Sequence, residues 1–215
     1  MAGKTILLRK ISGSETSPVC AIVVGAFLVK MVGNKKNYDE IDVLRLFLRI
    51  NGKIARTKLT KEMQLGEGSI KGILTKLKQK KLIVSTNKGH KLTQKGIKIK
   101  GQLFEQISQI KKIKLDVFHN LTGQAILIRN ANKKISYKVR DVAIRVGAEA
   151  ALLFKYDKRL FLAQCEQDLI DTSSLDKIFK FTQGDVCAVV FAKENNVIEK
   201  ALLNIAYHLN EKVLI

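Results

Sequence analysis

The sequence contains no tryptophan, a single proline and three cysteines, and aromatic residues make up only 6% of the chain. Cys20, Cys165 and Cys187 lack the short spacing of metal knuckles and redox pairs, so we expect reduced thiols rather than a disulfide framework. With 46% hydrophobic residues and no long Ser- or Gly-rich tract, the composition excludes a disordered chain. The 215 residues predict a globular protein of one or two domains.

Apolar runs long enough to cross a bilayer are also missing. The run over residues 19–29 is too short to span a membrane, and the polar stretch SGSETSP separates it from Lys10, unlike a secretory signal. We therefore expect a cytoplasmic protein without a membrane partner. Residues 1–37 form an N-terminal extension with several interpretations: a segment upstream of a true start at Met31, an element added to the core, or a weak membrane attachment.

Acidic residues are scarce, with 19 Asp and Glu against 39 Lys and Arg, so the formal net charge is +20. Residues 53–100 hold 14 of the basic residues and only two acids, Glu62 and Glu67. Residues 119–215 hold 14 basic and 11 acidic residues and are nearly balanced. A basic module is thus joined to a neutral one, a pattern typical of a nucleic-acid-binding domain attached to a different kind of domain.

The basic module has a regular order of predicted elements. Acids near its N-terminus and apolar residues at helical spacing predict a helix over 38–50, followed by a short extended segment at 53–55. Thr57 is a candidate N-cap for a second helix through Met63, and a Gly-rich turn leads to a third helix ending near residue 81. Strand-like runs at 82–86 and 90–93 around a turn at 87–89 predict a hairpin.

The segment LTKEMQLGEGSIKGILTKLKQKKLIVSTNKGHKLTQKG, residues 59–96, resembles the winged-helix family of DNA-binding domains. The resemblance covers the turn, the helix and the hairpin wing in the family's order. It implies a winged helix-turn-helix domain over 38–92 that binds double-stranded DNA. The helix beginning near Gly68 would enter the major groove, and the tip at 88–91 would reach the adjacent backbone or minor groove.

Helical geometry identifies the candidate DNA-binding residues. Ile70, Ile73, Leu74 and Leu77 form one apolar stripe, so Gly72 and Thr75 fall near the opposite side. We interpret Gly72 as allowing close approach to DNA, because no core contact is expected there. That face carries no Arg, Asn or Gln before Gln79, which predicts binding mainly through phosphates. The alternative is a solvated basic helix in a protein-binding domain. The predicted DNA-binding residues are Ser69, Lys71, Gly72, Thr75, Lys76, Lys58, Lys88, His90 and Lys91.

Residues 93–118 read as one long linker helix. Its apolar stripe consists of Ile99, Leu103, Ile107, Ile110 and Ile113. This stripe is either a dimer seam or a face that packs back on the basic module, and it is too short for a sustained coiled coil. We expect a homodimer.

The second module, residues 119–215, alternates strands and helices. The pattern predicts strands at 125–129, 149–156, 159–163 and 185–192, and helices at 134–146, 173–181 and 195–209. The order β-α-β-β-α-β with a terminal helix is that of ferredoxin-like folds, so we predict an α+β protein. A role in binding a small-molecule effector, or in assembly, rests on analogy with other regulators alone.

The segment KVRDVAIRVGAEAALLF, together with the basic module, resembles a family of uncharacterised archaeal proteins. These proteins pair a winged helix with a C-terminal domain of unknown function, and the resemblance spans about residues 38–210. It implies a transcriptional regulator without indicating a ligand. Arg140, Asp141 and Arg145 are candidate ligand-binding residues, although Asp141 and Arg145 have the spacing of an ordinary surface ion pair on a helix.

Catalytic motifs are not apparent anywhere in the sequence. The second module has no Gly-rich phosphate loop, nucleophile elbow or cluster of metal ligands, and we expect no enzyme, no cofactor and no metal site. The preferred function is a DNA-binding transcriptional regulator with a C-terminal sensing or dimerisation domain. The alternative is a winged-helix factor that binds RNA or protein without sequence-specific DNA binding. An enzyme with a DNA-binding head is disfavoured.

Overall fold

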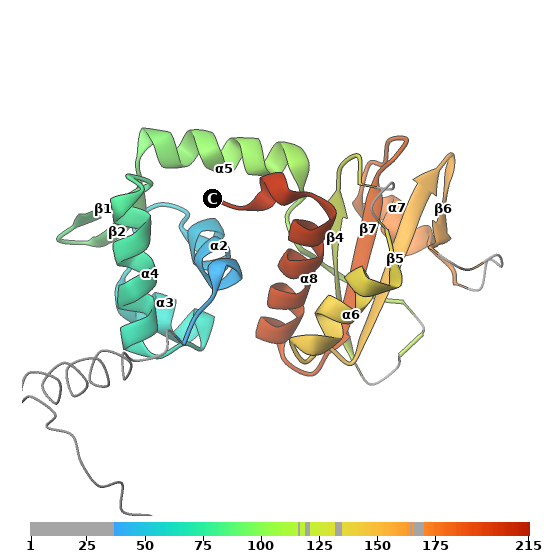
Figure 1. The fold of residues 1–215 in the computed structure, drawn as a ribbon, viewed down its shortest axis with the longest axis horizontal. Coiled ribbons are helices and arrows are strands. Elements are labelled where there is room, and N and C mark those ends of the chain that lie inside the picture. Colours follow the sequence, from blue (N-terminus) through green and yellow to red (C-terminus); the bar gives the residue numbers. More distant parts are fainter. Residues whose placement is uncertain (1–36, 116, 119–120, 132–134, 164, 166–169) are drawn as a thin grey trace, which may run out of the picture. The chain divides into compact units, whose positions relative to one another are not determined.

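The structure is a computed structural model, and it describes residues 37–115, 117–118, 121–131, 135–163, 165 and 170–215. The apolar run at 19–29 and Met31 lie outside these residues. The described chain begins with helices, continues through a short hairpin and ends in a sheet with helices on both faces (Figure 1). It is therefore an α+β protein, as the sequence predicts.

Helix α2, Glu40–Arg49, begins at a capping box. The Asp42 backbone N–H donates to Asp39 Oδ1 at 2.9 Å, and the Asp39 N–H donates to Asp42 Oδ2 at 3.2 Å. The residues from Ile41 to Phe47 are all buried, because α2 contacts α4 on one side and α8 on the other. A helix that is buried around most of its circumference lies inside the protein rather than on its surface.

Helices α3, Arg56–Met63, and α4, Glu67–Gln79, follow with a tight turn in which Gln64 has a left-handed backbone (φ 51°). The predicted stripe of Ile70, Ile73, Leu74 and Leu77 is buried, which confirms the helical period of this segment. Strands β1, Ile83–Thr86, and β2, Gly89–Leu92, form the predicted hairpin. Ile54 adds a single bridge to His90, where the short extended segment was expected.

Helix α5, Gln94–Gln106, is shorter than the helix predicted over 93–118. The chain becomes extended at Ile107, which bridges Ile128, and continues into strand β3, Lys111–Ile113. Ile107 and Ile113 are buried, but through contacts with the sheet rather than along a helix face. The prediction of one long helix was therefore wrong beyond Gln106, because a buried isoleucine fits either element and the neighbouring strand decided between them.

The described strands of the second half form one antiparallel sheet in the order β3-β4-β7-β5-β6. Its elements are β4, Thr122–Ile128; helix α6, Tyr137–Arg145; β5, Ala150–Asp157; β6, Arg159–Leu162; helix α7, Ser173–Ile178; β7, Val186–Ala192; helix α8, Asn195–Leu209; and the 3-10 helix η2, Glu211–Val213. Helices α6 and α8 cover one face and α7 the other. Element order along the chain agrees with the prediction for this module.

The strand order differs from that of the predicted ferredoxin-like fold. In that fold the third strand of the β-α-β-β-α-β unit lies between the first and the second. Here the fourth strand, β7, takes this place, and the third, β6, lies at the edge. Every residue of β7 is buried, whereas β6 is short and partly exposed. The central position therefore belongs to the strand that is apolar on both faces, which element order alone does not reveal.

The larger hydrophobic core does not stop at the boundary between the two modules. It contains buried residues of α2, such as Val43 and Leu46, together with residues of α8, such as Ile198 and Leu202. A second core on the other face of the sheet includes Phe154 and Phe191. Residues 37–215 consequently form one compact unit.

Candidate nucleic-acid interface

One side of α4 is covered by the start of α2. A Cβ atom at Gly72 would lie 2.9 Å from ring atoms of Tyr38, and Lys76 forms an ion pair with Glu40. The interpretation of Gly72 as a residue that opens the helix to DNA was therefore wrong, since the glycine makes room for the tyrosine ring. Lys76 is half-buried, and Glu40 already neutralises its charge. Gly72 and Lys76 are therefore not part of the candidate interface.

The other side of α4 is open. Lys71 and Thr75 are exposed, and the Thr75 hydroxyl donates to the Lys71 carbonyl at 2.9 Å. Ser69 is partly buried near the first turn. Within the described residues, Lys71 has no carboxylate within ion-pair distance. This side of the helix therefore presents an unneutralised ammonium group beside small polar side chains.

Lys78 and Arg56 extend the open side, although neither was predicted. Lys78 lies seven residues after Lys71, which is about two helical turns, so both are on the same flank of α4. Helical geometry alone could have predicted this. Arg56, the first residue of α3, is exposed as well. Neither residue has an acidic partner among the described residues. Arg56 on α3 and Lys78 on α4 both lie close enough to His90 to affect its pKa, a relation that no local pattern in the sequence contains.

His90 marks where these charges meet. It lies in β2, and its Nδ1 is 2.8 Å from the Ser85 hydroxyl. Partial burial, followed by the positive charges of Lys78 and Arg56, lowers the pKa of His90 below its usual value. His90 is consequently neutral near pH 7, and it contributes a hydrogen-bonding ring rather than a charge.

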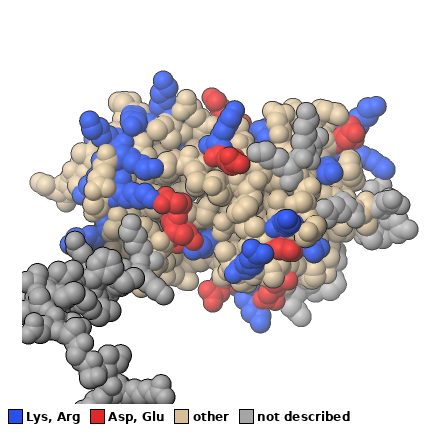
Figure 2. All heavy atoms as spheres, viewed as in Figure 1, with Lys and Arg blue, Asp and Glu red and all other residues tan. Residues whose placement is uncertain are grey.

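The remaining predicted lysines differ in their surroundings. Lys88 at the hairpin turn and Lys91 on β2 are exposed, without a carboxylate partner in the described part of the chain. Lys58 is exposed, but its Nζ lies 3.7 Å from Glu62 Oε1 one turn along α3. Figure 2 shows Lys and Arg side chains gathered around α4 and the hairpin, whereas both signs of charge are mixed over the sheet. We name the surface of Arg56, Lys71, Thr75, Lys78, Lys88, His90 and Lys91 the basic face.

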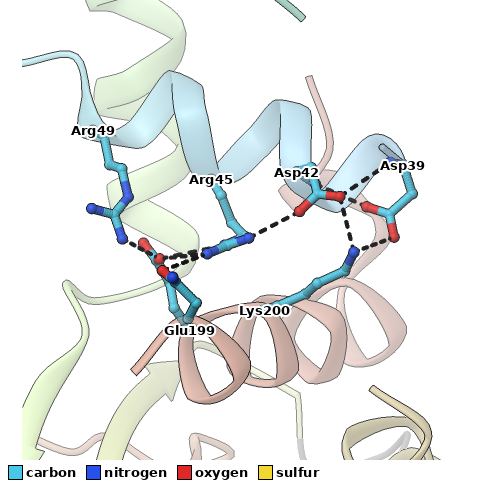
Figure 3. Close-up of polar contacts among 7 residues, drawn as sticks. Asp39, Asp42, Arg45, Arg49, Glu199 and Lys200 are labelled. Carbon is cyan, nitrogen blue, oxygen red and sulfur yellow. Dashed lines mark hydrogen bonds and ion pairs between the residues drawn. The ribbon is translucent and has the colours of Figure 1, made fainter. Parts of the chain in front are cut away.

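A polar network joins α2 to α8 and was not predicted (Figure 3). Arg45 donates to Asp42 at 2.9 Å, to Asn196 at 3.1 Å and to Glu199 at 3.2 Å, and its residue exposure is only 2%. Arg49 binds the same Glu199 carboxylate oxygen. The network therefore links residues about 150 positions apart along the chain.

Lys200 completes the network at the start of α2. Its Nζ lies 2.8 Å from Asp39 and 2.9 Å from Asp42. Partial burial alone would raise the pKa of Asp39, but the Lys200 bond and the Asp42 backbone N–H outweigh it, so the pKa is lowered. Burial likewise opposes the charge on Lys200, yet the two carboxylates raise its pKa. Both groups are charged at neutral pH.

The candidate ligand residues of α6 do not form a site. The side chains of Arg140 and Asp141 lie 3.8 Å apart, so Asp141 pairs with its neighbour rather than with Arg145. Arg140 lines a hollow of about 80 Å³, far below the roughly 300–1,000 Å³ of ligand pockets. Three larger hollows have volumes of about 570 Å³ beside β3, about 420 Å³ between α2, α5 and α8, and about 770 Å³ beside α5. Arg140, Asp141 and Arg145 line none of them.

Within the described residues, no group of three or more His, Cys, Asp or Glu side chains is arranged to hold a metal ion. No helix in the same residues is both long and apolar enough to cross a membrane. Asp171 accepts hydrogen bonds from the backbone N–H and hydroxyl of Ser173, two residues on, which is a local turn just before α7.

Two family models match this chain, and the boundary between them lies where the charge changes from basic to nearly balanced. Residues 39–98 match the model of the PH0730-like N-terminal domain, and residues 120–209 match that of a domain of unknown function, DUF4443. Among solved structures, the chain is similar to the hypothetical protein PH0730 from the archaeon Pyrococcus horikoshii OT3, with 27% sequence identity and a TM-score of 0.69. The match covers 81% of this chain and 94% of that one. No protein with a curated description matches the chain.

Proposed function

We propose that this protein is a DNA-binding transcriptional regulator rather than an enzyme, and that the basic face contacts duplex DNA. The observation that carries the proposal is the unneutralised charge of Lys71 and Lys78 on α4 and of Arg56 on α3. Lys78 and Arg56 lie close enough to the neutral His90 to lower its pKa. Lysines and arginines without carboxylate partners are free to replace the counterions of a phosphate backbone.

The arrangement of elements supports the same proposal. Helices α2, α3 and α4 are followed by the β1–β2 hairpin, and Ile54 bridges the hairpin. This is the order of elements that we expect for a winged helix-turn-helix domain. In such a domain α4 would enter the major groove and the turn at Lys88 would reach the flanking backbone. The side chains on the open side of α4 are short or flexible, and no guanidinium or amide precedes Gln79 there. We therefore expect affinity to come mainly from phosphates, with modest sequence discrimination.

Binding across a salt series tests this proposal. Fluorescence anisotropy would measure the dissociation constant of the full chain for labelled duplex DNA and for duplex RNA of the same length. Log affinity should fall linearly with log salt concentration, by about 0.9 per phosphate contact with B-form DNA. The double variant Lys71→Ala/Lys78→Ala should lower the slope by about 1.8 because it removes two contacts.

A matched control separates the basic face from net charge. Lys138→Ala/Lys177→Ala removes the same charge from exposed positions of α6 and α7, and we expect it to leave the slope near that of the natural sequence. Selection from genomic fragments should enrich a small set of duplex sites, and the Lys71/Lys78 variant should lose them. Equal slopes for both double variants would refute the role of the basic face. Tighter binding to duplex RNA than to DNA would point instead to an RNA-binding assembly factor.

A further inference from the structure

The apolar stripe expected to form a dimer seam on α5 is not available for that role. Leu103 and Ile107 are buried against the protein's own core, and Ile99 is half-buried. The exposed side of α5 carries a different set of residues. Ile97 is 54% exposed and Phe104 is 37% exposed, with the exposed Gly101 between them. Their spacing of four and then three residues puts all of them on one side of the helix.

We propose that this side of α5 pairs antiparallel with α5 of a second copy of the chain, around a two-fold axis near Gly101. In a two-fold interface the same patch on both subunits must be complementary to itself. Ile97 and Phe104 lie at nearly equal distances on either side of Gly101. An antiparallel pair therefore brings Ile97 of one subunit against Phe104 of the partner subunit, and the contact occurs twice.

Gly101 fits the centre of this contact. A Cβ atom there would meet nothing within 4 Å, so the packing of the chain itself does not require a glycine. Glycine inside a helix costs roughly 1 kcal/mol relative to alanine, yet here it stands in the middle of α5. A crossing helix accounts for it, because the missing side chain lets two backbones approach closely.

Charge favours the same arrangement. Lys98 and Glu105 are exposed on the flank of α5 next to Gly101, and neither has an oppositely charged partner among the described residues. In an antiparallel pair, like flanks meet in reversed order, so Lys98 of one subunit lies near Glu105 of the partner subunit. This opposite-charge contact is formed twice, whereas the formal net charge of +20 opposes unspecific self-association.

The surface beside α5 extends the apolar contact. A groove of about 770 Å³ is lined by Ile97 and Phe104 together with Ile50, Val84 and Leu92, and Val84 is 40% exposed. Apolar side chains from the partner's α5 would fill its mouth, adding buried area from the hairpin to that of the helix. Of the basic face, only Lys91 lines this groove. Its other residues lie on α3, on α4, at the hairpin turn and at His90.

Sedimentation velocity of the full chain, without nucleic acid and over a range of protein concentrations, tests the proposal. We expect a dimer for the natural sequence and a monomer for Gly101→Gln, which adds an uncharged side chain at the crossing point. Circular dichroism should show that this variant folds, because the space around Gly101 is open within the chain. Lys98→Glu and Glu105→Lys should each raise the dimer dissociation constant at least tenfold. The double swap Lys98→Glu/Glu105→Lys should restore it to near its original value.

Lys138→Glu on α6 serves as the control, since it makes the same charge change as Lys98→Glu far along the chain. It should leave the dissociation constant of the dimer unchanged. A monomeric natural protein at every concentration would overturn the proposal. So would a dimer that survives Gly101→Gln, or a double swap that fails to recover what the single swaps lose.

Discussion

Replacing Arg45 should cost far more stability than replacing an exposed basic residue in a similar ion pair. Arg45 is 2% exposed and Asp42 is 1% exposed, so both charges lie in the protein interior. Arg45→Met keeps much of the side-chain volume but removes all four hydrogen bonds that Arg45 donates to Asp42, Asn196 and Glu199. Breaking a buried ion pair by removing one partner typically costs 3–5 kcal/mol, because the other charge is left buried.

We expect the lower end of that range here, about 3 kcal/mol, because both carboxylates retain another partner. Asp42 keeps its bond to Lys200, and Glu199 keeps Arg49. For a chain of this size the loss corresponds to a fall in Tm of about 6–12 °C. Urea unfolding at pH 7, followed by circular dichroism, gives the free energy of unfolding directly.

Lys76→Met is the matched comparison, since Lys76 and Glu40 form an ion pair whose side chains are 30% and 55% exposed. Such surface pairs contribute about 0–1 kcal/mol, and salt weakens them further. The Arg45 effect should persist at high salt. A loss below about 1 kcal/mol for Arg45→Met, or one equal to that of Lys76→Met, would refute the assignment of this network as the principal polar link between α2 and α8.

Two further predictions concern backbone packing and pH. Gly96→Ala should destabilise the protein by about 1–3 kcal/mol, because its Cβ would overlap the Leu82 carbonyl oxygen. Gly101→Ala has open space around it within the chain and should stabilise the folded subunit by up to about 1 kcal/mol. Thermal unfolding of both variants, at a concentration where the chain is monomeric, measures the contrast, and equal effects would contradict it. The lowered pKa of Asp39 means that its contribution to stability is present above its unfolded value of 3.8 and is lost as pH falls through the folded value. Asp39→Asn should therefore be less stable than the natural protein at pH 7, and the difference should shrink on acidification; a constant difference from pH 7 to pH 3 would exclude this linkage.

Local patterns in the sequence predicted most of the helices and strands, because apolar residues recur with a different period in a helix than in a strand. The stripe of Ile70, Ile73, Leu74 and Leu77 is buried as expected, and the hairpin follows it in the predicted place. The same reasoning failed at Ile107 and Ile113, where isoleucines at helical spacing belong to extended chain. It also left the strand order undetermined, since the central place of β7 depends on which strands need burial on both faces.

The candidate site was predictable only in part, for a similar reason. The exposure of Lys71 and Thr75 was predictable because it follows from the position of the apolar stripe, while their contact with DNA stays a prediction. Gly72 and Lys76 were misread because their partners, Tyr38 just before α2 and Glu40 at its start, lie more than 30 residues earlier in the chain. Contacts of that range, like those between α2 and α8, leave no periodic trace in the sequence.

The position of α2 limits how this protein can be divided or recombined. The segments that match the two family models, residues 39–98 and 120–209, read as separable pieces. A fragment ending before α8 would nevertheless leave Asp42 and Arg45 without Lys200 and Glu199, and would expose apolar residues such as Val43 and Leu46 to water. If one half is exchanged between related genes, the contact face of α2 must still fit that of α8. Substitutions on these two faces are therefore constrained to occur together.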